Sequence, residues 1–166
     1  MIMKKRYKII IICVCVICLI AFAIFGGLVG SGNYGYAQQY EFNTTDSVLI
    51  NKVKLIKDQN PDFRIPSSIS LKDYLANGKF HFYIYYKNEN QIVHCFIMNT
   101  LNNPNNTSIY LDAINYGLTL GNWKVVNSDY DRSDNLKVKL QFEERFLNKL
   151  KLPYQDEGNG NFVFWK

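Results

Sequence analysis

The longest apolar stretch of the chain runs from Ile9 to Val29 and contains no charged residue. Its 21 residues read IIIICVCVICLIAFAIFGGLV. At a rise of about 1.5 Å per residue, a helix of this length spans roughly 30 Å, which is the thickness of the hydrocarbon core of a bilayer. The pattern therefore predicts a transmembrane helix over residues 9–29.

Charged residues flank this stretch unequally. Lys4, Lys5, Arg6 and Lys8 precede it, and the next charged residue along the chain is Glu41. Because cytoplasmic flanks are enriched in Lys and Arg, this asymmetry predicts a cytoplasmic N-terminus with the rest of the chain outside. The predicted organisation is a basic cytoplasmic segment (1–8), a signal-anchor helix (9–29), a linker (30–40) and an extracytoplasmic α+β domain (41–166).

A cleaved signal peptide is the alternative interpretation of the same segment. Gly35-Tyr36-Ala37 has the small residues of a signal-peptidase site, and cleavage after Ala37 would release a secreted protein that begins at Gln38. However, the apolar run is longer than the roughly 7 to 15 residues of a typical signal core. The uncleaved anchor is therefore the favoured interpretation.

Beyond residue 40, the spacing of apolar positions changes between a helical period and an alternating one. The predicted helices are residues 46–58, 70–76 and 133–150, with Asn77-Gly78 closing the second. The predicted strands are the two arms of a hairpin within 80–98, two short strands within 108–126 and a final strand at 162–166, with a turn in the DEGNGN stretch before it and no element running through Pro104. Mostly consecutive strands predict an α+β fold, in which two to three helices pack on one face of an antiparallel sheet.

The last predicted helix has an apolar arc, with Ser133 as its cap. The members of this arc fall on one side at about 100° per residue and are Leu136, Leu140, Phe146, Leu147 and Leu150. Glu143 lies within the same arc. A carboxylate on a buried surface can have a raised pKa and act as an acid or base, so Glu143 is a catalytic candidate.

Composition excludes several functional classes. Four of the 19 Lys and Arg residues precede the membrane run, whereas all 14 Asp and Glu residues follow it, so the outer domain has a net charge of only +1. Nucleic-acid binding requires a clustered basic surface, and we expect no nucleic-acid partner. The chain has no phosphate-binding loop, dinucleotide motif or zinc-protease motif, and it predicts neither a metal site nor a cofactor.

The predicted hairpin contains both histidines and Cys95. If Lys87 pairs with Gln91, Tyr83 faces Cys95 and His81 becomes its diagonal neighbour, about 7 Å away at the backbone. That register would permit a thiolate–imidazolium pair and a cysteine-dependent hydrolase. A shift by one residue removes the pairing, and a buried structural thiol is the favoured interpretation.

Aromatic residues provide the candidates for ligand binding. Tyr83, Tyr85 and Trp123 could line a binding surface, although alternating aromatics also suit strands and cores. Taken with the anchor, these features predict a non-enzymatic, single-pass membrane protein, held by residues 9–29, whose outer domain binds a protein or envelope component. The alternatives are the hydrolase that uses Cys95 and His81, and a secreted binding module cleaved at Ala37.

Overall fold

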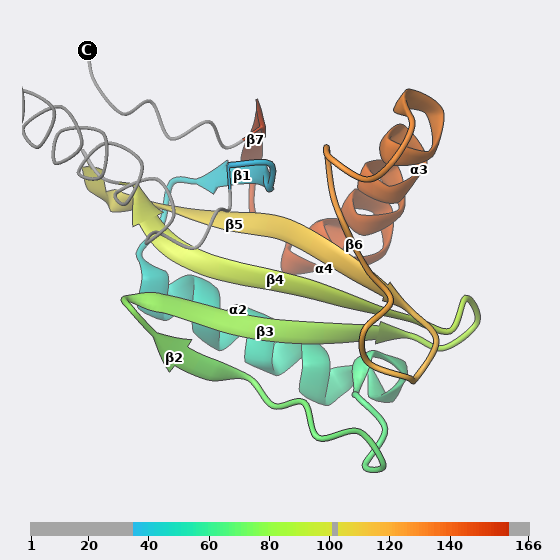
Figure 1. Cartoon of the computed structure of the whole chain (residues 1–166). Coiled ribbons are helices and arrows are strands. Elements are labelled where there is room, and N and C mark those ends of the chain that lie inside the picture. The colour runs from blue at the N-terminus through green and yellow to red at the C-terminus, as the bar shows by residue number, and fades with distance from the viewer. Residues whose placement is uncertain (1–34, 101–102, 160–166) are drawn as a thin grey trace, which may run out of the picture. The chain divides into compact units, whose positions relative to one another are not determined.

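The computed structural model describes residues 35–100 and 103–159 (Figure 1). The predicted transmembrane helix at 9–29 and the predicted final strand at 162–166 lie outside these residues. Within the described part, no helix has both the length and the apolar character needed to cross a membrane. The described residues confirm the α+β class with an antiparallel sheet.

Seven strands form one sheet within the described ranges, and each of their pairings is antiparallel. The strands are β1 (Gln38–Phe42), β2 (Tyr74–Ala76), β3 (Lys79–Tyr86), β4 (Gln91–Thr100), β5 (Asn103–Tyr116), β6 (Trp123–Val125) and β7 (Tyr154–Asn159). Their order is β2-β3-β4-β5-β1-β7. Because β5 is long, β1 pairs with its first half and β6 pairs with its second half on the same edge.

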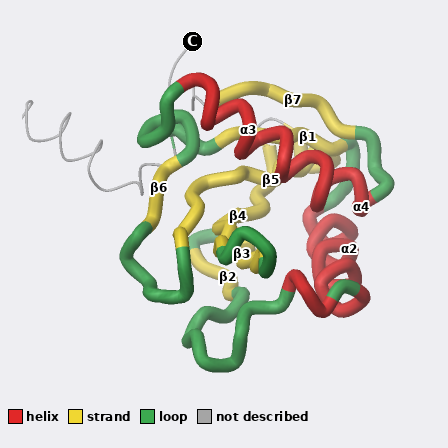
Figure 2. The backbone as a smooth tube through the Cα atoms, turned by 90° about the vertical axis from the view of Figure 1, so that its right-hand side faces the viewer, coloured by secondary structure: helices red, strands yellow, loops and turns green. Residues whose placement is uncertain are grey.

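The helices cover one face of this sheet (Figure 2). They are α2 (Asp46–Gln59), α3 (Arg132–Phe142) and α4 (Asn148–Leu150), with a π-helical turn at Glu143–Leu147 and a 3-10 turn at Pro61–Phe63. Apolar side chains of α2, α3 and α4 share one buried cluster with alternate residues of the central strands. The helix predicted at 46–58 is confirmed as α2, which buries Leu49, Val53 and Ile56.

The short helix predicted at 70–76 is wrong, because this segment ends in β2. Asn77 and Gly78 both have positive φ angles, 51° and 72°, and they connect β2 to β3. Two consecutive left-handed residues are what a type I′ hairpin turn requires, and Asn-Gly is its preferred sequence. The dipeptide therefore turns a hairpin here instead of ending a helix.

The buried face of the last helix also differs from the prediction. Leu136 and Leu140 are 57% and 45% exposed, whereas Val138 and Phe142 are buried. Val138, Phe142 and Phe146 are buried and lie four residues apart, a spacing that turns by about 40° at each step around a regular α-helix. The π-helical turn, which has i→i+5 bonding, adds a residue and keeps the later positions facing the core.

Three further boundaries are corrected. Residues 38–40 of the predicted linker begin β1, which lies between β5 and β7. Residues 154–159, which include part of the predicted turn, form β7. Pro104 lies inside β5 next to an irregularity in the β4–β5 pairing, and prolines are tolerated near strand starts and at such irregularities.

Candidate functional site

The β3–β4 hairpin pairs one residue away from the predicted register. Tyr86, and not Lys87, lies opposite Gln91, so that Phe82 lies opposite Cys95. The connecting turn contains four residues instead of three. A slip of one residue exchanges the two faces of a strand, so this correction reassigns Cys95 to the face that the helices cover.

Cys95 and His81 consequently lie on opposite faces of the sheet. Cys95 is fully buried in the main core, and burial raises the pKa of its thiol and favours the neutral form. His81 points to the face opposite the described helices, where its ring contacts Phe96. The juxtaposition on which the predicted thiolate–imidazolium pair depended is therefore absent.

Glu143 and Tyr85 lie apart from the histidines. Glu143 begins the π-helical turn and accepts a hydrogen bond from the Tyr40 hydroxyl at 3.0 Å. Burial, followed by the proximity of this carboxylate, raises the pKa of Tyr40 far above its usual value. Tyr85 donates a hydrogen bond to Asn90 Oδ1 at 3.0 Å, within the hairpin turn.

Three of the predicted candidates, His81, Tyr83 and Trp123, do come together, and they surround His94. His81 Nδ1 lies 3.1 Å from His94 Nε2, and His94 Nδ1 lies 2.9 Å from Asp112 Oδ2. We call this chain of Asp112, His94 and His81 the imidazole array. It runs across the three neighbouring strands β5, β4 and β3.

Sequence reasoning missed both His94 and Asp112. In the predicted register, with Tyr83 opposite Cys95, His94 lies on the face of the hairpin opposite to His81, and Asp112 belongs to no recognisable motif. The available signal was the alternation of Phe80, Phe82 and Ile84 along β3, which predicts that His81 and Tyr83 lie on the opposite face. Once the register with β4 is known, His94 lies on that opposite face as well.

Aromatic rings pack against the array from neighbouring strands. Tyr74 of β2 stacks on His81 with centroids 4.6 Å apart and planes 6° from parallel. Tyr83 stacks on His94 at 5.0 Å, and Trp123 of β6 meets His94 edge-on at 6.1 Å. Tyr83 and Trp123 are therefore partners of a histidine, and Tyr83 is only 8% exposed.

The hydrogen bonds assign the tautomers of the neutral array. The Asp112 carboxylate can only accept, so His94 Nδ1–H donates to it. His94 Nε2 is then an acceptor, and His81 Nδ1–H donates to it. An added proton that makes His94 a cation reverses the bond between the imidazoles, so that His94 donates and His81 Nδ1 accepts.

The array resists a second proton. Burial, followed by the proximity of His94 and Lys79, lowers the pKa of His81 from 6.5 to about 4, against the opposing effect of Asp112. If both imidazoles were charged, each of the two facing nitrogens would carry a hydrogen across only 3.1 Å. One added proton therefore leaves a hydrogen bond between the rings, and a second added proton removes it because both facing nitrogens are then donors.

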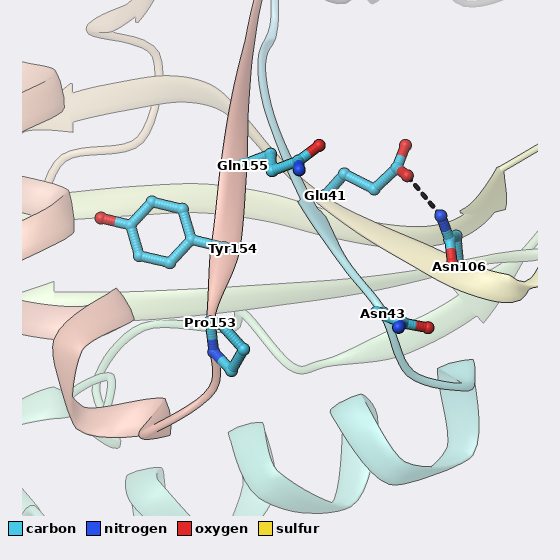
Figure 3. A pocket seen from close by; sticks show the side chains of 6 residues that line it. All are labelled: Glu41, Asn43, Asn106, Pro153, Tyr154 and Gln155. Atoms are coloured by element: carbon cyan, nitrogen blue, oxygen red, sulfur yellow. Dashed lines mark hydrogen bonds between the residues drawn. The ribbon is translucent and has the colours of Figure 1, made fainter.

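A second candidate site is an open hollow of about 530 Å³ at the ends of β1, β5 and β7. The lining residues are Glu41, Asn43, Asn106, Pro153, Tyr154 and Gln155 (Figure 3). Glu41 Oε1 accepts a hydrogen bond from Asn106 Nδ2 at 2.5 Å, and its other oxygen accepts one from Thr100 Oγ1 at 3.4 Å. Within the described residues, Glu41 forms no ion pair with Lys or Arg.

No sequence signal identifies this hollow. Glu41 comes from β1, whose first residues were predicted as linker, and Gln155 comes from β7, a strand that was not predicted. Asn106 belongs to the segment around Pro104, through which no element was predicted to run. The hollow exists because β1 and β7 pair with each other, although they lie near opposite ends of the domain sequence.

The described part of the chain contains no group of three or more His, Cys, Asp or Glu side chains that could hold a metal ion. Comparisons of the chain with protein-family models, with curated proteins and with solved structures return no significant match. The functional argument therefore depends on the geometry of the hollow and the array, together with the sequence.

Proposed function

We propose that this protein is a single-pass membrane-anchored domain that faces outside the cytoplasm and binds an envelope component in the hollow. The uncharged run at 9–29 and the cations before it support the anchor and its orientation. The hollow is the observation that supports binding most directly, because its volume lies within the range of about 300 to 1,000 Å³ typical of ligand sites.

The lining of the hollow suits a polyhydroxylated ligand, such as a saccharide chain of the envelope. Glu41 offers carboxylate acceptors, and the amides of Asn43, Asn106 and Gln155 offer both donors and acceptors. The Tyr154 ring packs on Tyr40 and Phe42 of the core and points away from Glu41, so it forms part of the wall of the hollow and the polar groups carry recognition. A site dominated by hydrogen-bonding groups recognises hydroxyls better than it recognises an apolar cofactor.

Binding to isolated envelope polysaccharide tests this proposal. We expect the full chain, purified in mild detergent, to bind in a calorimetric titration, and we expect Asn43→Trp to weaken binding at least about tenfold by filling the hollow, equivalent to about 1.4 kcal/mol. Asn148→Trp, the same change at an exposed position on α4, is the matched control. Binding that Asn43→Trp leaves unchanged would contradict the assignment of the hollow.

Topology is tested separately. A reporter fused after Lys166 should be active outside the cytoplasm, and the chain should remain with the membranes after an alkaline wash. Recovery of a soluble mature form that begins at Gln38 would contradict the anchor and favour the secreted module.

The environment of Ala37 also supports the anchor over that secreted form. Ala37 is fully buried and packs with Phe96 and Tyr110. The carbonyl of the preceding Tyr36 accepts a hydrogen bond from Asn127 Nδ2 at 2.7 Å. Cleavage after Ala37 would remove these contacts from the folded domain.

A further inference from the structure

The short strand β2 protects one edge of the sheet. It pairs with β3 through Tyr74, Leu75 and Ala76 alone, and Leu75 is 72% exposed. Just before it, Asp73 Oδ1 accepts a hydrogen bond from the backbone N–H of Tyr83 at 3.1 Å. Together these contacts satisfy the part of the β3 edge that would otherwise present unpaired backbone groups.

Two side-chain contacts hold β2 in place. Asp73 forms an ion pair with Lys57 of α2, with a nitrogen–oxygen distance of 2.5 Å. Tyr74 stacks flat on His81, directly opposite it in the pairing. One of the two contacts therefore depends on the imidazole array, while a three-residue edge strand contributes little stability of its own.

The ionisable groups that face the array come from each side of it. Among residues 35–100 and 103–159 they are Tyr74 on β2, Lys79 and Tyr83 on β3 and Asp112 on β5, while β4 and β6 contribute the uncharged rings of Phe96 and Trp123. Asp112 is the one acidic group among them, and it is already paired with His94. A positive charge on His81 would face Lys79 and, when His94 is also protonated, a second charged imidazole.

We infer that the imidazole array is an acid-sensitive clasp, in which protonation of both histidines breaks the His81–His94 hydrogen bond and releases β2 from the edge of β3. The released edge exposes backbone N–H and C=O groups of β3, which are the groups that bind an added strand. This device is independent of ligand binding in the hollow.

The sign and size of the effect follow from linkage. The closed clasp holds the pKa of His81 at about 4, below its ordinary 6.5. The closed state is therefore fully favoured above pH 6.5, loses stability as the pH falls below that value, and stops losing it below about pH 4. If His81 recovers its ordinary pKa on opening, the opening constant rises about 20-fold at pH 5 and on the order of 100-fold at pH 4, relative to pH 7.

Hydrogen–deuterium exchange of the full chain between pH 7 and pH 4 tests the clasp. After correction for the intrinsic rates of an unstructured peptide, we expect amides of residues 74–81 to lose protection by a factor approaching those values. Amides of β5 within residues 109–114 should stay protected, because opening is confined to the edge. His81→Phe, which keeps a ring against Tyr74 but cannot titrate, should abolish the pH dependence.

Two controls keep the test decisive. Asp73→Asn should increase exchange of β2 at every pH and preserve its pH dependence, which separates the array from the Asp73–Lys57 contact. An NMR titration of the wild-type imidazoles needs no variant to fold. Titration of His81 near pH 6.5 in the folded chain, or equal acid-induced opening in wild type and His81→Phe, would overturn the inference.

Discussion

A fragment that begins at Gln38 should be less stable than one that begins at Gly35. The perturbation removes the buried methyl group of Ala37 and the hydrogen bond from Asn127 to the Tyr36 carbonyl. The methyl group contributes about 0.8 kcal/mol and the partly exposed hydrogen bond about 0.5 to 1 kcal/mol. The expected loss is thus about 1.5 kcal/mol.

The new N-terminus adds a second penalty. In the shorter fragment a charged α-amine replaces a peptide bond at Gln38, a residue with no exposed surface. Burying a charge is unfavourable, although the nearby Asp156 carboxylate, which accepts a hydrogen bond from the Gln38 side chain, offsets part of the cost. Because an α-amine has a pKa of about 8, the difference between the fragments should shrink at pH 9.

Thermal unfolding followed by circular dichroism measures the difference, with both native starts produced by removing a cleavable tag. For a domain of this size, about 1.5 kcal/mol corresponds to a fall in Tm of roughly 5 to 9 °C. Residues 1–34 are missing from both fragments, so the comparison isolates residues 35–37. Equal Tm values would refute the reasoning and would make a secreted form that begins at Gln38 as stable as the anchored domain.

Three further predictions follow from single side chains. Cys95 should react slowly with a thiol reagent in the folded chain and rapidly after denaturation, because burial raises the pKa of its thiol; rapid labelling at neutral pH would contradict this. Val138→Ala should lower the free energy of unfolding by about 2 kcal/mol because Val138 is buried, and Leu136→Ala should lower it by less than about 0.5 kcal/mol because Leu136 is exposed. Chemical denaturation measures both values, and the reverse order would support the arc predicted from the sequence. Tyr40→Phe should cost about 2 kcal/mol in the same assay by removing the hydrogen bond to Glu143, and no loss would mean that this bond is not formed in solution.

The sequence predicts features that local patterns determine. The stripe of Leu49, Ile50, Val53 and Ile56 identifies α2, because a regular helix keeps such positions on one side. In α3 the same method fails, because the π-helical turn changes the phase after Phe142 and nothing in a 100° periodicity anticipates an inserted residue.

Register and long-range pairing are harder to predict than element type. Whether Lys87 or Tyr86 lies opposite Gln91 depends on one residue of turn length, yet it decides which chemical groups share a face. The strand β1 was missed because only its pairing with β5 and β7, far along the chain, makes it a strand. In contrast, the hairpin at Asn77-Gly78 was available from the sequence, since this dipeptide is a strong local signal for a type I′ turn.

Glu41 of the hollow and His81 of the array both point to the face of the sheet opposite the described helices. Glu41 alternates with Tyr40 and Phe42, which are buried in the core, so its side chain points away from the helices, as His81 does between Phe80 and Phe82. An antiparallel sheet with helices on one face leaves the other face for polar chemistry.

The two sites are nevertheless separate along the strand that they share. Asn106 in the hollow and Asp112 in the array are both on β5, and six residues of strand span about 20 Å. Side chains more than about 10 Å apart with no common partner act nearly independently. We therefore expect a substitution in the array to leave ligand binding in the hollow unchanged, and a substitution in the hollow to leave the exchange of β2 at acid pH unchanged.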